Sequence, residues 1–172
     1  MNVLIVHYSF TGTCRRIGEA LQARFGWAAG EITDAVPGRG NWRCVLDSLL
    51  RRRPSIRYAG PAIRSFDTVV LVAPIWVYRL AGPMRAFVTE HRGELPSVVL
   101  VTAMGGRGAP NALAEVTDIL GRPPALFLPL TTREVEDGSF VERLEGFRGD
   151  IAPAGNRPRT PHREAIISTR DA

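Results

Sequence analysis

The sequence predicts an α/β fold of three layers, in which helices cover both faces of a doubly wound parallel sheet of five strands. Two observations favour this fold. Continuous apolar runs of strand length alternate along the chain with segments whose apolar residues recur at helical spacing. Runs that are apolar throughout are typical of parallel strands buried on both faces. The expected strands are residues 3–6, 31–34, 69–73, 98–101 and 125–128.

The expected helices lie between and after these strands, where apolar residues recur every three or four positions. Pro83 suits a first helical turn because proline lacks the N–H that has no helical partner there, and Gly121 ends a later helix. The strand 31–34 is half polar, so we expect it at an edge of the sheet. The expected helices are the segment after Gly12 that carries Ile17 to Phe25, residues 41–52, a helix begun at Pro83, residues 113–120 and residues 140–147.

Length and composition bound the organisation of the chain. With 172 residues, of which 45% are hydrophobic, the chain has the size of one domain with a substantial core. We expect that domain at residues 1–150 and a flexible basic tail at 151–172, where proline and arginine replace apolar periodicity. The longest apolar run, residues 68–78, contains Pro74 and is shorter than the roughly 20 residues of a spanning helix. The N-terminus lacks the charged start of a signal peptide, so we expect a soluble cytoplasmic protein.

The residue types exclude several kinds of chemistry. All 22 basic residues are arginine, and the absence of lysine rules out a Walker-type phosphate loop, a Schiff-base lysine and pyridoxal chemistry. Cys14 and Cys44 form no disulfide framework, begin no Cys-x5-Arg loop and, like His7, His91 and His162, have no metal-ligand spacing. We therefore assign no metal ligand and no catalytic residue.

Arginine is concentrated between residues 43 and 64, where six arginines face one acidic residue, Asp47. Such a segment could bind an anionic partner such as nucleic acid. Few aromatic residues interleave with the charge, which favours a solvated surface instead. We therefore do not expect nucleic-acid binding.

The loop after the first strand has the residues of an anion site. It joins an apolar run to a helix start, where free backbone N–H groups and the positive end of the helix converge, and it is rich in hydroxyl groups. This loop resembles the phosphate loop of flavodoxin-like proteins, which bind the 5′-phosphate of FMN with the pattern Ser/Thr-x-Thr-Gly-x-Thr. The matching residues are Ser9, Phe10, Thr11, Gly12, Thr13 and Cys14. Cys14 departs from the pattern by replacing a hydroxyl, and an ordinary strand-to-helix turn is the alternative.

Two further loops resemble the same family. The first follows the strand 69–73 and resembles the second flavin-contacting loop, in which an aromatic residue after a proline covers the isoalloxazine ring; its residues are Pro74, Ile75, Trp76, Val77 and Tyr78. The second matches in position the loop that hydrogen-bonds the pyrimidine side of the flavin; its residues are Ala103, Met104, Gly105, Gly106 and Arg107. Core packing of the aromatic rings and a helix cap with spare glycines are the alternatives.

The resemblance covers roughly residues 1–148 and implies the flavodoxin strand order 2-1-3-4-5 and noncovalently bound FMN. We expect a redox protein, and an NAD(P)H-linked oxidoreductase that reduces a quinone or another small acceptor is the favoured form. A one-electron shuttle with a protein partner is an alternative, but shuttle flavodoxins are typically acidic and this chain has a formal charge of +5. Arg79 and Arg107 are the cations nearest the expected ring. A flavin-free module that binds an anionic partner through its arginine-rich face is an alternative of another class, and the oligomeric state is not predicted.

Overall fold

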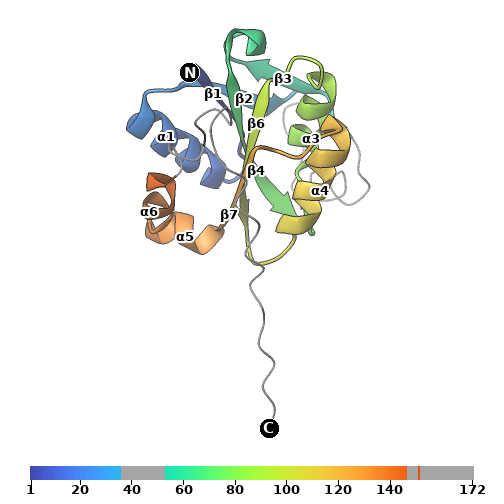
Figure 1. Ribbon diagram of the computed structural model, residues 1–172. Coiled ribbons are helices and arrows are strands. Elements are labelled where there is room, and N and C mark those ends of the chain that lie inside the picture. The colour runs from blue at the N-terminus through green and yellow to red at the C-terminus, as the bar shows by residue number, and fades with distance from the viewer. Residues whose placement is uncertain (36–52, 147–150, 152–172) are drawn as a thin grey trace, which may run out of the picture.

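A central sheet runs through the molecule between two layers of helices (Figure 1). The computed structural model describes residues 1–35, 53–146 and 151. The strands are β1 (Val3–Tyr8), β2 (Ala28–Asp34), β3 (Ile56–Ala59), β4 (Thr68–Trp76), β5 (Arg79–Leu80), β6 (Ser97–Met104) and β7 (Leu126–Thr131). The helices are α1 (Thr13–Phe25), the short 3-10 helix η1 (Ile63–Ser65), α3 (Gly82–Glu90), α4 (Ala109–Leu120), α5 (Thr132–Asp137) and α6 (Phe140–Glu145).

The sheet confirms the expected topology. Its strand order is β3-β2-β1-β4-β6-β7, and β2, β1, β4, β6 and β7 are parallel to their neighbours in this path. These five strands reproduce the order 2-1-3-4-5. Two short antiparallel strands are added to them, β3 beside β2 and β5 beside β4. The expectation that residues 31–34 form an edge is wrong, because β3 pairs with Glu31–Asp34 and takes the edge position.

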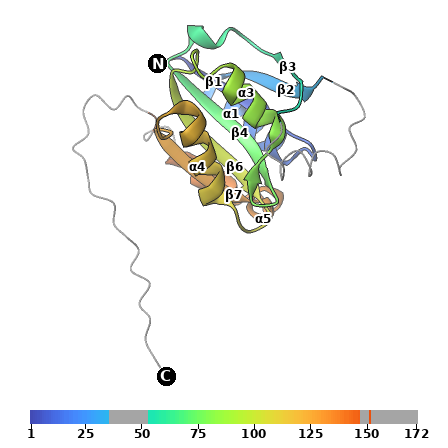
Figure 2. The same cartoon turned by 90° about the vertical axis from the view of Figure 1, so that its right-hand side faces the viewer.

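Two apolar clusters hold the helices on the sheet, one on each face. On β1, Leu4 and Val6 belong to the cluster that contains α3 and α4, whereas Val3 and Ile5 belong to the cluster that contains α1, α5 and α6. Figure 2 shows α3 and α4 side by side on their face of the sheet. The side chains of Leu4, Val6 and Ile5 have no exposed surface, which is why this strand is apolar at every position rather than at alternate ones.

The C-terminal part of the fold differs from the expectation in two details. β7 extends beyond residue 128 through Pro129, and it tolerates proline because it is an edge strand paired only with β6. The helix expected at 140–147 is confirmed as Phe140–Glu145 in the described residues, and α5 precedes it. The sequence signal for α5 is the Thr131-x-x-Glu134 capping box.

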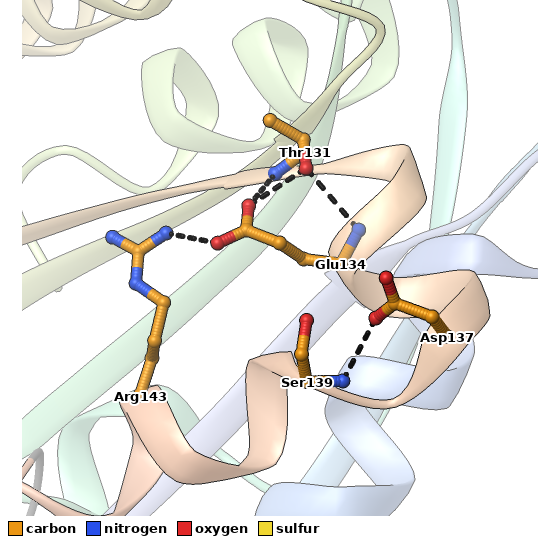
Figure 3. A network of polar contacts seen from close by, with 5 residues as sticks. All are labelled: Thr131, Glu134, Asp137, Ser139 and Arg143. Atoms are coloured by element: carbon orange, nitrogen blue, oxygen red, sulfur yellow. Dashed lines mark hydrogen bonds and ion pairs between the residues drawn. The ribbon is translucent and has the colours of Figure 1, made fainter.

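Figure 3 shows this capping box. The Thr131 hydroxyl accepts a hydrogen bond from the Glu134 N–H at 3.2 Å, and the Thr131 N–H donates to the Glu134 carboxylate at 2.6 Å. Arg143 donates to the same carboxylate from α6 at 2.8 Å. The bonds from Thr131 lower the pKa of Glu134, with a smaller contribution from Arg143, so the carboxylate stays ionised and fixes α5 directly after β7.

Some expectations fall outside the described residues. These are the helix at 41–52, residues 43–52 of the arginine-rich segment, Cys44 and the tail from residue 152. The division into a domain and a tail therefore remains a prediction.

A buried ion pair joins α3 to α4. The side chains of Arg85 and Glu115 are both 4% exposed, and the Arg85 Nε–H donates to the Glu115 carboxylate. The other end of the Arg85 guanidinium donates to the Leu80 carbonyl of β5 at 2.8 Å. Arg85 thus connects α3 and α4 to β5, the short strand that pairs with the end of β4.

Among the described residues, no helix has the length and apolar character needed to cross a membrane. The same residues contain no group of three or more histidine, cysteine, aspartate or glutamate side chains that could hold a metal ion.

We predict that Glu115→Gln lowers the free energy of unfolding by about 3 kcal/mol, because it removes a buried charge from its hydrogen-bonded partner. Asp118→Asn makes the same chemical change at an exposed position on the same helix and should cost less than about 0.5 kcal/mol. Urea unfolding of both variants is the measurement. Equal losses would show that the Arg85–Glu115 pair does not stabilise the fold.

Candidate functional site

The parallel order β1-β4-β6 brings three loops to one edge of the sheet. β1 and β4 are paired from Val3↔Thr68 to His7↔Val72, and β4 and β6 from Thr68↔Ser97 to Pro74↔Ala103. The carboxyl ends of the three strands therefore meet, and so do the loops that follow them. This edge holds the sequence-predicted site residues together, as expected for a doubly wound sheet.

The loop between β1 and α1 presents backbone N–H donors that have no partner within the helix. Gly12 has φ 92°, a conformation that favours glycine, and it caps α1 without a side-chain hydrogen bond. The first hydrogen bond of the helix runs from the Arg16 N–H to the Gly12 carbonyl at 3.0 Å, so the N–H groups of the three preceding residues have no partner within the helix. The hydroxyls of Thr11 and Thr13 lie 3.3 Å apart at the same turn. These groups form a cradle for an anion.

Ser9 adds a buried hydroxyl to this loop. Its Oγ is inaccessible to solvent and has no hydrogen-bond partner in the described part of the chain. A buried hydroxyl without a partner costs about 1 to 3 kcal/mol. A phosphate oxygen would supply the missing acceptor once the Ser9 side chain turns toward the surface of the loop.

A pocket of about 370 Å³ lies beside this loop. It is lined by Thr11, Gly12, Thr13, Arg15, Arg16, Glu19, Val135 and Glu136. Arg15 is engaged by the Glu31 carboxylate at 2.5 Å, whereas Arg16 has no ion pair with a described residue. The loop therefore has cationic side chains beside it although the protein contains no lysine.

Cys14 lies away from the loop surface. Its side chain is 1% exposed and packs in the apolar cluster beneath α1. Burial raises the pKa of the Cys14 thiol to about 12, so the side chain is a neutral thiol at physiological pH. What Cys14 can offer to an anion is its backbone N–H.

Trp76 is the last residue of β4 rather than part of the loop after it. Its ring meets the rings of Tyr8 and Phe10 edge-on, with centroids 5.9 and 5.8 Å away. The Tyr8 hydroxyl donates to the Asp34 carboxylate at 3.1 Å. The alternative of core packing therefore holds in part for Trp76, because the ring is partly buried against the cluster beneath α3 and α4.

Val77 and Tyr78 form the two-residue turn of a hairpin between β4 and β5. The hairpin pairs Ile75 with Leu80 and Trp76 with Arg79. Both turn residues have positive φ, 47° for Val77 and 63° for Tyr78, which is unusual outside glycine and asparagine and costs about 1 to 2 kcal/mol per residue. The sequence gives no signal of this turn, because neither residue is a turn former.

The third loop approaches this hairpin closely at Gly108. A Cβ on Gly108, whose φ is 111°, would lie 2.6 Å from the Tyr78 Cα. Two open pockets flank the contact, and both are lined by Tyr78, Gly106 and Arg107. The hairpin and the third loop are therefore in contact through Tyr78 and Gly108, and Gly108 is not among the residues that the sequence predicts for the site.

His7 lies one residue before this edge, beneath α1. Burial lowers the pKa of His7, and the neighbouring Glu31, whose carboxylate is 3.7 Å from Nε2, only partly offsets the effect. Neither ring nitrogen has a hydrogen bond in the described residues. The ring packs against Gly18, where an added Cβ would lie 3.3 Å from its Nδ1. These contacts favour a packing role for His7.

No protein-family model matches the sequence, and no curated protein is detectably similar to it. Solved structures do resemble the fold. A flavoprotein in complex with FMN from Lactobacillus acidophilus NCFM has a TM-score of 0.64 at 15% identity, over 80% of this chain and 98% of that chain. A putative flavoprotein from Bacteroides eggerthii DSM 20697 has a TM-score of 0.63 at 22% identity, over 81% and 96%. The flavodoxin, WrbA-like protein from Agrobacterium tumefaciens has a TM-score of 0.51 at 13% identity, over 87% and 94%. The chain therefore has the flavodoxin-like fold.

We predict that Gly108→Ala lowers the free energy of unfolding by about 3 kcal/mol, since it adds a clash with the Tyr78 backbone to the cost of an unfavourable φ. Gly121→Ala is the matched control. Gly121 also caps α4 at positive φ, but an added Cβ meets nothing within 4 Å there, so we expect a loss of about 1 kcal/mol. Thermal or urea unfolding that gave the same loss for both variants would contradict the close contact between the two loops.

Proposed function

We propose that the chain binds FMN noncovalently at the edge formed by the three loops and transfers electrons through it. The observation that carries the proposal is the β1–α1 turn, where the buried Ser9 hydroxyl and the free N–H groups at the start of α1 all need an acceptor. The fold shared with a flavoprotein that binds FMN supports the same conclusion. When bound, FMN supplies reversible uptake of one or two electrons.

In this proposal each of the three loops binds a different part of FMN. Ser9, Thr11, Thr13 and the backbone of Gly12 and Cys14 hold the phosphate, while Phe10 flanks the loop. On the hairpin, Pro74 and Ile75 precede Trp76, whose edge contacts with Tyr8 and Phe10 fix its ring, and Val77 and Tyr78 expose an apolar turn beside it. Ala103, Met104, Gly105, Gly106 and Arg107 offer backbone groups to the polar edge of the ring. Neutral dipoles thus replace the lysine that other phosphate loops use.

The finer proposal is an NAD(P)H-linked oxidoreductase that reduces a quinone or another small acceptor, located in the cytoplasm. It is supported by the basic charge of the chain and by two arginines at the hairpin and the third loop, the partly buried Arg79 and the exposed Arg107, which suit an anionic dinucleotide. One-electron exchange with a redox protein is the second candidate. It is favoured by the exposed apolar turn at Val77 and Tyr78.

Titration of the protein with FMN tests the binding proposal. We expect the flavin fluorescence to change on binding, and Ser9→Ala to weaken FMN binding by about tenfold or more, because a hydrogen bond to a charged group contributes roughly 1.5 to 3 kcal/mol. Riboflavin lacks the phosphate, so its weaker binding should be the same for both proteins. Ser65→Ala, in η1 before the start of β4, is the control. If FMN keeps its free-solution fluorescence in the presence of excess protein, FMN binding is ruled out. The remaining candidate is then the flavin-free interaction module, which predicts salt-sensitive binding to an anionic polymer.

Steady-state assays with a quinone test the finer proposal. We expect FMN-loaded protein to consume NAD(P)H in a quinone-dependent reaction at about 1 s⁻¹ or faster. Protein without FMN, under the same conditions, is the control. Loaded protein that exchanges electrons with redox dyes but never oxidises NAD(P)H would identify the shuttle instead.

A further inference from the structure

The first turn of α1 contains arginine at the end of a helix that favours acidic residues. Arg15 and Arg16 lie in this turn, which has no aspartate or glutamate, whereas Arg24 in the last turn is at the favourable end. The N-terminal end of a helix carries partial positive charge, so a cation there lowers stability unless an anion compensates it. The first turn of α1 therefore has an excess of positive charge.

The two arginines of this turn differ in their partners. The Arg15 guanidinium donates to the Glu31 carboxylate of β2 at 2.5 Å, so the protein itself neutralises that charge. Arg16 is exposed and forms no ion pair with any residue in the described part of the chain. Glu19 and Glu136 line the same pocket as Arg16, but neither is paired with it. Arg16 is thus a cation without a described counter-charge.

Arg16 lies next to the groups that form the anion cradle. It lines the pocket of about 370 Å³ together with Thr11, Gly12 and Thr13. Its backbone N–H donates to the Gly12 carbonyl at 3.0 Å, which places Arg16 one helical turn, about 5.4 Å, beyond the start of the helix. Helical side chains lean toward the N-terminal end of their helix. An arginine side chain is longer than one turn, so the Arg16 guanidinium can reach an anion held at the cradle.

We propose that Arg16 is a binding residue for the phosphate of the flavin, and that its guanidinium neutralises charge for which the loop provides only hydrogen bonds. The inference rests on the proposed FMN binding and adds to it a residue outside the phosphate-loop pattern at residues 9–14. A phosphate monoester carries a charge of about −1.5 to −2 at pH 7. A hydrogen bond from arginine to phosphate is roughly twice as strong as one between neutral groups. Arg15 does not take this role, because Glu31 already engages it.

This role has opposite consequences for stability and for binding. In the protein without flavin, the unpaired charge of Arg16 at the positive end of α1 is unfavourable. Once a phosphate is bound, the same charge is favourable. A residue that only kept the helix in solution would not change the two properties in opposite directions. A gain in stability that accompanies a loss of affinity is therefore the signature of the proposed role.

Urea unfolding of the full chain without flavin, and titration of that chain with FMN, test this role. Arg16→Gln removes the charge, and we expect it to raise the urea midpoint and to weaken FMN binding by about tenfold or more. Arg16→Lys keeps the charge and should weaken FMN binding less than about threefold. Arg15→Gln is the matched control, because it makes the same change one residue earlier on a guanidinium that Glu31 neutralises. It should change FMN affinity less than about threefold and should not raise the urea midpoint.

Two simpler ligands separate the phosphate from the ring. Riboflavin has no phosphate, so Arg16→Gln should leave its affinity within about twofold of the wild-type value. Inorganic phosphate has no ring, and at millimolar concentration it should raise the melting temperature of the wild-type chain more than that of Arg16→Gln. This second measurement does not require the protein to bind a flavin.

The outcomes distinguish this inference from the proposed function. Equal losses of FMN affinity in Arg16→Gln and Arg15→Gln, a loss of the same size for riboflavin, or an Arg16→Gln chain less stable than wild type would refute the role of Arg16 while leaving FMN binding intact. If no variant binds FMN, the proposed function is wrong, and inorganic phosphate decides on Arg16. Equal stabilisation of wild type and Arg16→Gln by phosphate would then overturn the inference as well.

Discussion

The parallel pairing of β1, β4 and β6 is the constraint on which the candidate site depends. Because three adjacent strands point the same way, the turn at Gly12, the hairpin at Val77 and the loop that ends at Gly108 emerge side by side, although nearly one hundred residues separate the first from the last. The pairing is fixed by strands that are apolar on both faces and must be covered by helices on both. The site is therefore a consequence of how the core is buried.

Much of the fold could be predicted from the sequence, because the central strands are continuous apolar runs that can be recognised without the structure. The elements that were missed have no such signal. β3 and β5 are short; β3 pairs along β2, and β5 pairs with Ile75 and Trp76, the end of β4 that extends beyond its pairing with β6. The turn at Val77 and Tyr78 contradicts residue preference and is visible only in three dimensions. The 3.6-residue period could not reveal α5, which is six residues long and depends on a capping box at Thr131.

The site could be anticipated as a set of loops but not as an arrangement of side chains. The hydroxyl and glycine pattern predicts an anion site in this loop, and the structure adds that the Ser9 hydroxyl is buried without a partner among the described residues while Cys14 faces the core. The resemblance predicts that Trp76 covers a ligand ring, and the structure adds that Trp76 makes T-shaped contacts with the rings of Tyr8 and Phe10. Sequence patterns specify which residue types occur at a strand end, whereas orientation follows from the pleat of each strand and from its neighbours.

The burial of Cys14 has a consequence for the chemical durability of the protein. Burial raises the pKa of the Cys14 thiol to about 12, so little of it is present at pH 7 as the thiolate, the form that reacts readily with peroxides. Hydrogen peroxide converts an accessible thiolate to sulfenic acid, whereas a buried neutral thiol is inert. The sulfur atom of Cys14 is buried beneath the first turn of α1. The thiol that stands where the flavodoxin pattern has a hydroxyl therefore does not make this loop sensitive to oxidation.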